Sequence, residues 1–524
     1  MINGFKHQND RHGASASAAA TSLGSTADNA SINSIEPDFE DDEPLVKQPL
    51  KTGRTCTFRC SMISLLVVIF LGIGVSVVFY TVLDLAQEEG PCDHSCRMIL
   101  VESVAEGLPS EPPHLMSTYE GWMMLLNLSQ SSIDIASFYW TLTNTDKVHD
   151  PSDAQGHKIY NKLKSLGKSP VNIRVVENEP NEKFHDKDSH DLDEDGAADV
   201  LSIDFKKMTK NGGGVLHTKF WIIDNKHFYI GSANMDWRSL TQINELGVIA
   251  LNCSCLTREL SKVFSIYWEV AQDHSKLPQK WPDRVTTKIN VKNLLRLMIN
   301  GTPASTTFGI SPPVFQAKNW SSDLELIWNA IKLARKRISI AVMDYSPTTL
   351  YNGDHNRYWA DIDNSLRHAV FDRGIEVRLM IGWWNHSLPE MKKFLHSLAA
   401  INGTGNRDRL GSVEVVSSQI CFLKLLFVFV LTCQRLYIVP SNSRQRSIPF
   451  ARVNHKKYMV TDNAAFIGTS NWSGDYFTNT AGVGLLVNQT GNDSSHYDPD
   501  IVQSQLQAVF DRDWNSPFAH PLDT

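Results

Sequence analysis

The sequence contains two histidine–lysine pairs, each followed at a fixed distance by an aspartate. The pattern His-x-Lys-x4-Asp occurs at residues 217–224 and again at residues 455–462, 238 positions further along. An imidazole can attack phosphorus or protonate a leaving oxygen, while a fixed ammonium neutralises the non-bridging oxygens of a phosphate ester. The two pairs therefore indicate phosphodiester chemistry by a duplicated catalytic unit.

A second agreement accompanies the repeat. A turn of small residues ending in asparagine follows each pattern, Gly231-Ser232-Ala233-Asn234 after the first copy and Gly468-Thr469-Ser470-Asn471 after the second. One short motif can arise by chance, but two copies with matching tails are a strong signal. The alternative is that these His and Lys side chains are only exposed positions of a solvated strand.

The residues around each pattern are apolar and rich in β-formers, with Asp-Asn at the break in both copies. This predicts two β-hairpins. Residues i and i+2 of a strand project to the same face, so His217 and Lys219 should share one cleft with His455 and Lys457.

Strands and helices alternate upstream of both hairpins. Expected first strands are residues 132–139 and 337–345, helices are 156–166 and 360–373, and second strands are 171–176 and 374–381. This alternation predicts an α/β fold with a largely parallel sheet in each half.

Longer strings carry a family resemblance. Residues 137–144, 216–221 and 453–460 resemble the phospholipase D superfamily, and the match runs from about Cys92 to the C-terminus. Within it, the chain is similar to the membrane-anchored endolysosomal phospholipases D three and four. The resemblance implies two α/β sandwich domains related by a pseudo-twofold axis, which we place at residues 84–290 and 291–524.

The resemblance also implies a mechanism without a metal or other cofactor. One histidine attacks phosphorus to give a phosphohistidine, and the other protonates the leaving oxygen and later activates water. We assign the nucleophile to His217, because the first half alone offers a downstream carboxylate, Glu245, to orient it. The matching place in the second half is near Gly482, so His455 becomes the general acid.

The remaining roles follow from the same resemblance. The residues expected to hold the phosphate are Lys219, Lys457, Asn234 and Asn471. Asp224 and Asp462, the last residues of the two patterns, are expected to secure loops.

The expected substrate is single-stranded DNA or RNA, degraded from its 5′ end. Trp140, Trp383 and Trp384 could stack bases, although core packing explains each equally well. The alternatives are a phosphodiesterase or transphosphatidylase acting on lysophospholipids, and a non-catalytic glycoprotein receptor that keeps the fold. The net charge of −7 excludes binding of nucleic acid by bulk positive charge and leaves a local basic cleft open. Because one histidine must start protonated, activity should favour acidic pH.

The N-terminal residues predict a membrane anchor. Residues 1–59 are polar and poor in aromatic side chains, which indicates a disordered tail, while residues 60–83 are uncharged and apolar and long enough to cross a bilayer. Basic residues precede this span and acidic residues follow it, so the tail should be cytosolic. We expect a type II membrane protein that travels from the endoplasmic reticulum and Golgi to endosomes and lysosomes. Its catalytic domains would be lumenal, and a homodimer is the assembly that we consider.

Lumenal topology fits the cysteines and the glycosylation motifs. Cys92 and Cys96 should pair with Cys253 and Cys255, in an order that the sequence leaves open, with a zinc site as the alternative. Asn-x-Ser/Thr acceptors stand at Asn127, Asn252, Asn300, Asn319, Asn385, Asn402, Asn488 and Asn492.

Two segments depart from the repeat. Residues 416–434 interrupt a strand expected to join residues 411–415 to 435–440, and we interpret this apolar insert as a retained intron or a wrong exon join, with a real extra strand as the alternative. Residues 191–196 match the first half of a calcium-binding loop, but position twelve is Ser202 instead of glutamate. A solvated surface loop is therefore the favoured interpretation.

Overall fold

The computed structural model describes residues 96–109, 111–144, 150–181, 186–209, 213–351, 356–403, 433–489 and 497–522. The expected tail and anchor, Cys92, Asn492 and residues 416–432 of the insert lie outside the described residues. Within the described ranges, no helix is both long and apolar enough to cross a membrane.

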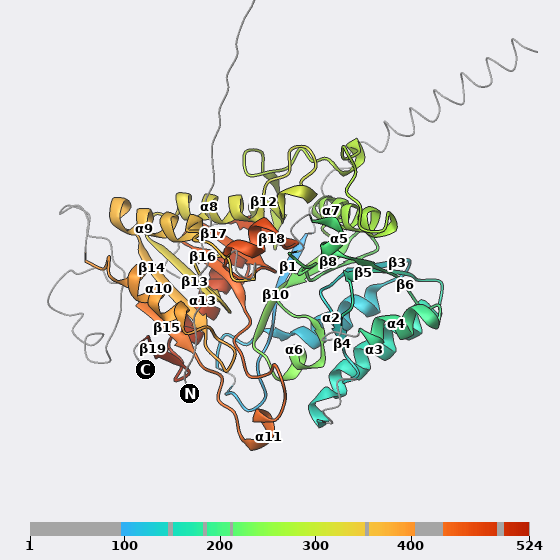
Figure 1. Ribbon diagram of the computed structural model, residues 1–524, viewed down its shortest axis with the longest axis horizontal. Helices are drawn as coiled ribbons and strands as arrows, with labels where there is room; N and C mark the ends of the chain where they lie inside the picture. The colour runs from blue at the N-terminus through green and yellow to red at the C-terminus, as the bar shows by residue number, and fades with distance from the viewer. Residues whose placement is uncertain are drawn as a thin grey trace, which may run out of the picture. The chain divides into compact units, whose positions relative to one another are not determined.

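The first half of the described chain forms an eight-stranded sheet in the order β2-β1-β10-β8-β7-β3-β5-β6 (Figure 1). Its strands are β1 (Arg97–Ser103), β2 (Met116–Ser117), β3 (Ser132–Ala136), β5 (Asn172–Asn178), β6 (Asp199–Ile203), β7 (Phe220–Ile223), β8 (His227–Gly231) and β10 (Glu245–Leu251). Two short strands, β4 (Trp140–Thr141) and β9 (Met235–Asp236), pair separately.

The second half forms a nine-stranded sheet in the order β11-β12-β18-β17-β16-β13-β14-β15-β19 (Figure 1). Its strands are β11 (Leu295–Ile299), β12 (Thr302–Ser311), β13 (Arg337–Val342), β14 (Glu376–Gly382), β15 (Cys433–Tyr437), β16 (Lys457–Thr461), β17 (Ala464–Gly468), β18 (Gly482–Asn488) and β19 (Ala519–Pro521). The central order β18-β17-β16-β13-β14 repeats β10-β8-β7-β3-β5 of the first half.

The expected strands and helices of both halves are confirmed, but the expectation of largely parallel sheets is wrong. Within the two large sheets of the described chain, parallel pairing is confined to the strand pairs β1–β2, β3–β5, β5–β6, β13–β14 and β14–β15. The hairpins β7–β8 and β16–β17 are antiparallel, as are their neighbours β10 and β18. A turn of two or three residues can join only antiparallel strands, so each hairpin makes its sheet mixed.

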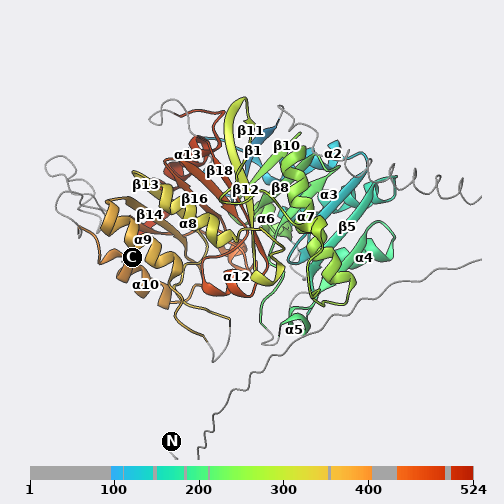
Figure 2. The same cartoon turned by 90° about the horizontal axis from the view of Figure 1, so that it is seen from above.

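Helices cover both faces of the two sheets (Figures 1 and 2). They are α2 (Thr118–Leu128), α3 (Ala154–Gly167), α4 (Lys187–Glu194), α5 (Phe205–Met208), α6 (Trp237–Thr241), α7 (Ser254–Gln272), α8 (Asp323–Leu333), α9 (Asp361–Arg373), α10 (Glu390–Ala399), α11 (Ser443–Arg446), α12 (Gly474–Thr478) and α13 (Val502–Trp514). Short 3-10 turns span Pro151–Asp153, Asp283–Val285 and Pro313–Phe315.

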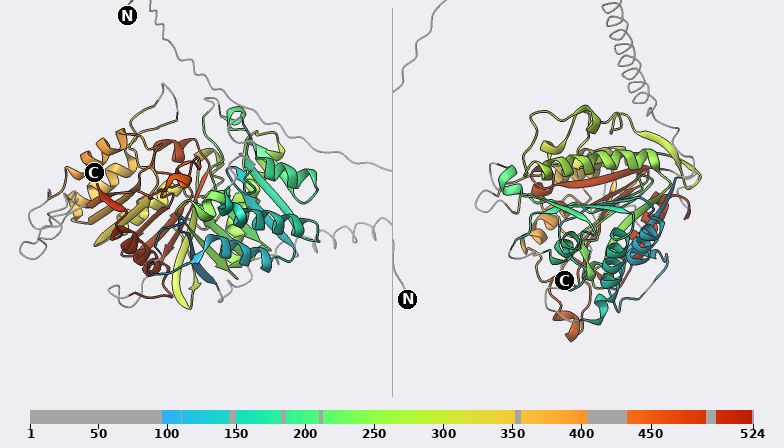
Figure 3. Two further views of the ribbon diagram at one scale, coloured as in Figure 1. Left: turned by 90° about the horizontal axis from the view of Figure 1, so that it is seen from below. Right: turned by 90° about the vertical axis from the view of Figure 1, so that its right-hand side faces the viewer.

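The helices also join the halves. α7 of the first half packs on β12 of the second, and α13 packs on β1 as well as on β16. The left view of Figure 3 shows the two sheets side by side with helices on their outer faces. One apolar core consequently contains residues of both halves, among them Leu260 of α7 and Phe510 of α13.

The helices α2 of the first half and α8 of the second half begin in the same way. Ser117 caps α2 and Ser322 caps α8, and in each case a glutamate three residues later, Glu120 or Glu325, completes a capping box. The sequence Ser-x-x-Glu thus starts a helix at equivalent places because both partners satisfy free backbone N–H groups.

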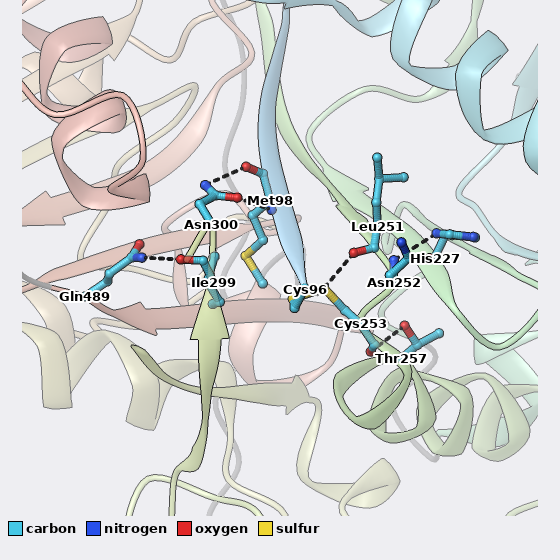
Figure 4. Close-up of a disulfide and its surroundings, with 10 residues drawn as sticks. All are labelled: Cys96, Met98, His227, Leu251, Asn252, Cys253, Thr257, Ile299, Asn300 and Gln489. Carbon is cyan, nitrogen blue, oxygen red and sulfur yellow. Dashed lines mark hydrogen bonds between the residues drawn. A yellow bond between two sulfur atoms is a disulfide. The ribbon is translucent and has the colours of Figure 1, made fainter. Parts of the chain in front are cut away.

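A disulfide joins the start of β1 to the segment that follows its neighbouring strand β10 (Figure 4). Cys96, just before β1, is bonded to Cys253, just before α7, with Cα atoms 4.5 Å apart. Cys255 is also disulfide-bonded. Pairing of the first cysteine set with the second is therefore confirmed for Cys96, and these three sulfurs are not available as thiolate zinc ligands.

The glycosylation motifs differ in exposure. Asn127, Asn252, Asn319 and Asn385 are exposed, while Asn300, Asn402 and Asn488 are half-buried. Figure 4 shows that the Asn300 carboxamide pairs with both backbone groups of Met98, accepting from N at 2.9 Å and donating to O at 3.0 Å. Asn300 therefore ties the β11–β12 hairpin to β1.

The two unusual segments are partly described. β15 begins at Cys433, opposite Arg378 of β14, so the last two residues of the expected insert belong to a strand. Asp191 and Asp193 lie in the last turns of α4, and the Asp193 carboxylate accepts a hydrogen bond from the N–H of Val200. Residues 191–196 are therefore a helix end whose residues 193–196 are exposed, which agrees with a solvated surface segment and not with a calcium-binding loop.

Candidate active site

Backbone bonds between the halves position the two histidines. The N–H of His217 donates to the carbonyl of Ala481 in the second half, at 2.9 Å, and the N–H of His455 donates to the carbonyl of Asn244 in the first half, at 2.8 Å. Both bonds belong to parallel β-bridges that repeat each other. Ala481 immediately precedes β18, and Asn244 immediately precedes β10. Each histidine is thus held by the residue before a strand of the opposite half, which brings the two His-x-Lys-x4-Asp patterns together.

A cavity of about 630 Å³ lies between them. His217, His455, Asn234 and Asn471 line it together, as the sequence predicted. The further lining residues used below are Phe138, Tyr139, Arg238, Asp344, Trp384, His386, Leu388, Phe450 and Tyr476. Site residues that are hundreds of positions apart in the chain therefore form one concave site.

The carboxylate of Glu245 contacts His455, and this corrects the expectation that it orients His217. Both carboxylate oxygens lie 2.9 Å from Nδ1 of His455. Ser232 and Ser239 donate their hydroxyls to the same carboxylate. The expectation was wrong because it assumed that a carboxylate serves the histidine of its own half, whereas β10 begins at the boundary between the halves, next to the bridge from Asn244 to Asn454.

The ring of His217 has a weaker partner. Its Nδ1 lies 3.0 Å from the carbonyl oxygen of Thr469, which can only accept, so Nδ1 carries a proton and Nε2 is left for the cavity. The rings of Phe138 and Tyr476 pack at 5.1 and 5.0 Å from the imidazole. These contacts fix the ring plane without adding a charge.

Burial and neighbouring charges lower the basicity of both imidazoles. Burial is the main cause that holds the pKa of His217 well below its usual value, and Lys219 and Lys457 add to it. Burial also lowers the pKa of His455, to about 4, although Glu245 opposes the shift. Burial alone would raise the pKa of Glu245, but His455, Lys457 and the hydrogen bonds outweigh it and leave that pKa lowered.

The two lysines are buried and, unlike the two histidines, are not among the residues that line the cavity, although the sequence predicted one shared cleft. Nζ of Lys219 donates to the carbonyl of His217 at 2.6 Å, and Nζ of Lys457 donates to the carbonyl of His455 at 2.8 Å. Burial lowers the pKa of Lys457 to about 8, and burial together with Lys457 holds the pKa of Lys219 well below its usual value. Because Lys457 lowers the pKa of Lys219, the two buried ammonium groups repel each other, and a bound anion would stabilise both.

The two asparagines have different partners. Nδ2 of Asn234 lies 3.4 Å from the hydroxyl of Tyr139, while Nδ2 of Asn471 donates to Asp344 at 3.0 Å and to the hydroxyl of Tyr476 at 3.1 Å. Burial raises the pKa of Asp344 to about 6, opposed by Lys457. The second half thus brings an extra titratable group to the cavity wall.

Asp224 and Asp462 secure loops, as expected, and neither lines the cavity. The carboxylate of Asp224 accepts from the N–H groups of Gln130, Ser131 and Ser132. The carboxylate of Asp462 accepts from the N–H groups of residues 335–337, where β13 begins. Each aspartate therefore ties a hairpin turn to the strand beside it.

Only one of the three tryptophans considered for base stacking lines the cavity. Trp140 is buried and its Nε1 donates to Ser137. Trp383 packs against an apolar core made of residues of the second half, and the ammonium group of Lys392 lies over its ring. Trp384 lines the cavity. Core packing therefore explains the first two.

Asp344, Arg238 and Tyr476 line the cavity but were not singled out in the sequence. Each has a recognisable position: Asp344 comes two residues after β13, and Arg238 and Tyr476 follow the motif asparagines by four and five residues. Inspection of the residues that follow the first strand and the motif asparagine of each half would have identified these three residues.

Comparisons with known proteins agree with this geometry. A family profile described as "PLD3/4, PLD-like domain" matches residues 110–415. The chain is 44% identical to a protein named 5′-3′ exonuclease PLD3 from Xenopus laevis, over 83% of this chain and 82% of that one. It is 43% identical to the protein of the same name from Homo sapiens, over 84% and 83%. It is 38% identical to a probable phospholipase D from Caenorhabditis elegans, over 82% and 72%.

Proposed function

The chain belongs to the PLD3/4, PLD-like domain family, and we propose that it is a phosphodiesterase that degrades single-stranded nucleic acid from the 5′ end through a phosphohistidine. The observation that carries this proposal is the pairing of two buried histidines across one cavity, one against a carboxylate and the other against a carbonyl. The substrate class rests on the two vertebrate relatives, which are named exonucleases.

The partners of the imidazoles decide the roles of His455 and His217. When an imidazole attacks phosphorus, it becomes cationic, and the carboxylate of Glu245 stabilises that charge on His455. A general acid must instead give up its positive charge, and a carboxylate partner would hold the proton in place. His217, which faces only a carbonyl, is the better acid. We therefore propose His455 as the nucleophile and His217 as the acid, the reverse of the expectation from sequence.

The two steps balance as follows. Nε2 of His455 forms a bond to phosphorus, the bond from phosphorus to the ester oxygen of the leaving strand breaks, and Nε2 of His217 gives that oxygen its proton. His217 then takes a proton from water, whose oxygen attacks phosphorus and breaks the bond to nitrogen. The phosphate monoester leaves, and both imidazoles return to their starting states.

The remaining polar groups hold the phosphate. The ammonium groups of Lys219 and Lys457 would neutralise the non-bridging oxygens, and Asn234 and Asn471 offer amide donors on the cavity wall. A bound phosphate anion would also raise the lowered pKa values of both lysines and both histidines, which favours the protonated form of His217.

The proposed location is the lumen of the endolysosomal system, with residues 60–83 as the anchor and residues 1–59 in the cytosol. The bond between Cys96 and Cys253 supports an oxidising compartment, and four exposed glycosylation motifs agree with it. A homodimer stays part of the proposal without a contact to support it.

The test uses the full-length chain in detergent and a 5′-hydroxyl single-stranded oligonucleotide at mildly acidic pH in EDTA. Stepwise release of nucleotides from the 5′ end, lost in His455→Ala, supports the proposal. If the folded protein released no nucleotide but exchanged the headgroup of lysophospholipid vesicles, the lipid alternative would replace it.

A further inference from the structure

The wall of the cavity that the second half provides carries a carboxylate that the two-histidine mechanism does not use. Asp344 follows the end of β13 by two residues, is 9% exposed and lines the cavity that the catalytic histidines share. Among the described residues, the amide of Asn471 is the one hydrogen-bond donor to this carboxylate, at 3.0 Å. A buried negative charge at this place opposes the binding of a phosphate.

The equivalent place in the first half holds a neutral side chain. β3 and β13 pair with β7 and β16 in the same register, which makes Ala136 equivalent to Ala341. Three residues further on, the first half has Tyr139 and the second half has Asp344. Each of these side chains is a partner of the motif asparagine in its own half. The same position is therefore neutral in one half and acidic in the other.

The charges behind the two positions also differ. The hydroxyl of Tyr139 donates to Asp236 at 2.7 Å, and the guanidinium of Arg238 balances that carboxylate, with Nε at 2.9 Å. Four residues after the motif asparagine, where the first half has Arg238, the second half has Asp475. No arginine at that place consequently balances the charge of Asp344.

Burial controls the protonation of Asp344. Burial raises the pKa of Asp344 to about 6, and the charge of Lys457 opposes this shift only in part. The carboxyl group is therefore mostly protonated at pH 5 and mostly ionised at pH 7. Burial lowers the pKa of Lys457 only to about 8, so its ammonium group stays mainly cationic over this range.

Other titratable groups surround Asp344. They are Tyr351 in the segment after β13, Asp475 and Tyr476 of α12, and, across the cavity, His217, His386 and His455. The carboxylate of Asp475 accepts from the N–H groups of residues 350 and 351. Burial raises the pKa of Tyr351 to about 12 and that of Tyr476 well above its usual value. The two phenols therefore do not change the charge of this wall between pH 5 and pH 7.

The hydrogen bonds of Asn471 connect Asp344 to the phosphate site. The Asn471 amide donates to Asp344 and to the hydroxyl of Tyr476, so both of its N–H bonds are in use. A phosphate that binds at Asn471 must therefore compete with the Asp344 carboxylate. A protonated carboxyl group is a weaker acceptor and has an O–H to donate, so protonation both reduces this competition and adds a donor.

We propose that Asp344 binds the substrate phosphate in its protonated form, by donating its O–H to a non-bridging oxygen, and repels the phosphate when it is ionised. This inference rests on the proposed phosphodiesterase function and adds a binding residue to that site. Acidic pH then favours substrate binding through Asp344, separately from the proton that His217 gives to the leaving oxygen. Asp344→Asn imitates the protonated acid, because an amide of the same size offers both a donor and an acceptor.

The experiment measures KM and kcat for a 5′-hydroxyl oligothymidylate at pH 5 and pH 7 with the full-length chain. The charge of this strand is constant over the range, so a change in KM reports the protein. In the unsubstituted protein, KM should rise about 10-fold, which is the change in the protonated fraction of a group with a pKa of about 6. In Asp344→Asn, KM should change by less than about twofold and should lie about 10-fold below the unsubstituted value at pH 7. The fall in kcat should be equal in both proteins, because it depends on His217.

Asp475→Asn and His386→Gln are the matched controls, because each changes another titratable residue of the same cavity. Both variants should keep the rise in KM. Asp344→Ser, which removes the charge with a smaller side chain, should lose the rise as Asp344→Asn does. An equal rise in Asp344→Asn, or an unsubstituted protein whose KM is the same at both pH values, would overturn the inference.

Failure of the proposed exonuclease function would give a different result. A folded protein that releases no nucleotide at either pH would count against that function. Diethyl phosphate, which carries a phosphodiester without a base or an acyl chain, would then be the probe, with its binding measured by calorimetry at both pH values. Tighter binding at pH 5 in the unsubstituted protein but not in Asp344→Asn would support the role of Asp344, and equal dependence on pH would overturn it.

Discussion

The two halves of the molecule place a carboxylate near the active site from different elements. In the first half Glu245 opens β10 and its carboxylate reaches His455 of the other half. The register-equivalent residue of β18 is Gly482, and the carboxylate there belongs to Asp323, the first residue of α8. The first residue of α2 is Thr118. The two halves share one fold but place their carboxylates differently, because single side chains differ at equivalent positions of the strands and helices.

Asp323 cannot do for His217 what Glu245 does for His455. Its carboxylate accepts from the hydroxyls of Ser311 at 3.1 Å and Ser470 at 3.3 Å. A side chain at Gly482 would begin 2.1 Å from the Ser470 hydroxyl and 3.3 Å from the Asp323 carboxylate. The space that Glu245 uses in one half is thus closed in the other, and His217 is left with a carbonyl partner.

The largest expected effect separates the two histidines. His455→Ala and His217→Ala should each lower the rate on oligonucleotides by about 10⁴-fold or more. On an ester of p-nitrophenol, which leaves without a proton, His217→Ala should release one equivalent of p-nitrophenol in a burst and accumulate the phosphoenzyme, because hydrolysis of the intermediate still needs His217 as the base. His455→Ala should do neither. Acid-quench labelling measures the intermediate. A phosphoenzyme in His455→Ala but not in His217→Ala would restore the assignment made from sequence.

The next effect tests the carboxylate of Glu245. Glu245→Gln should lower kcat by about 100- to 1,000-fold, because the amide keeps the contact but no longer stabilises a cationic His455. Steady-state kinetics on the oligonucleotide measures it. Glu177→Gln is a suitable control, since Glu177 is a buried glutamate of the same sheet that does not line the cavity. Equal losses in both variants would mean that the effect comes from folding.

The pH profile should reflect the unequal partners. The pKa of His217 is held low by burial, so the fraction that carries the acidic proton falls as pH rises. His455 stays neutral, and able to attack, above its pKa of about 4. We expect kcat/KM to decrease steadily from pH 5 to pH 8. Glu245→Gln should move the acidic limb to lower pH, because Glu245 raises the pKa of His455. A profile that rises toward pH 8 would contradict the assignment.

The smallest effect concerns Asp323. Burial raises its pKa to about 7 from an unfolded value near 4, so the folded state holds this proton more tightly than the unfolded state. The stability that this proton contributes is complete below about pH 4 and is lost as pH rises toward 7. Asp323→Asn should therefore be more stable than the unsubstituted protein at pH 7.5 and lose most of this advantage at pH 5, with activity within about threefold.

Thermal unfolding at the two pH values measures this difference. Thr118→Val, at the equivalent place in the first half, should show no difference that depends on pH. If Asp323→Asn were instead destabilised at pH 7.5, the carboxylate would be ionised and paired in the folded protein.

Much of the fold was accessible from sequence because it rests on local patterns. The hairpins follow from alternating β-formers around Asp-Asn, and the helices from residues 156–166 and 360–373 were confirmed as α3 and α9. The loop role of Asp224 and Asp462 was also predicted, because it needs only neighbours on the next strand. Parallel pairing was overestimated, since the hairpins and the outer strands that pair beside them are antiparallel.

The sequence by itself determined which residues could do phosphate chemistry and that they occur twice. The tertiary structure alone decided which carboxylate serves which histidine, because Glu245 and His455 are 210 residues apart and meet only through the bridges between halves. It likewise decided which aromatic rings face the cavity, burying Trp140 and exposing Phe450. Residue type and spacing show which reaction the side chains can perform. The role of each side chain depends on its contacts, and those depend on how the two sheets pack together.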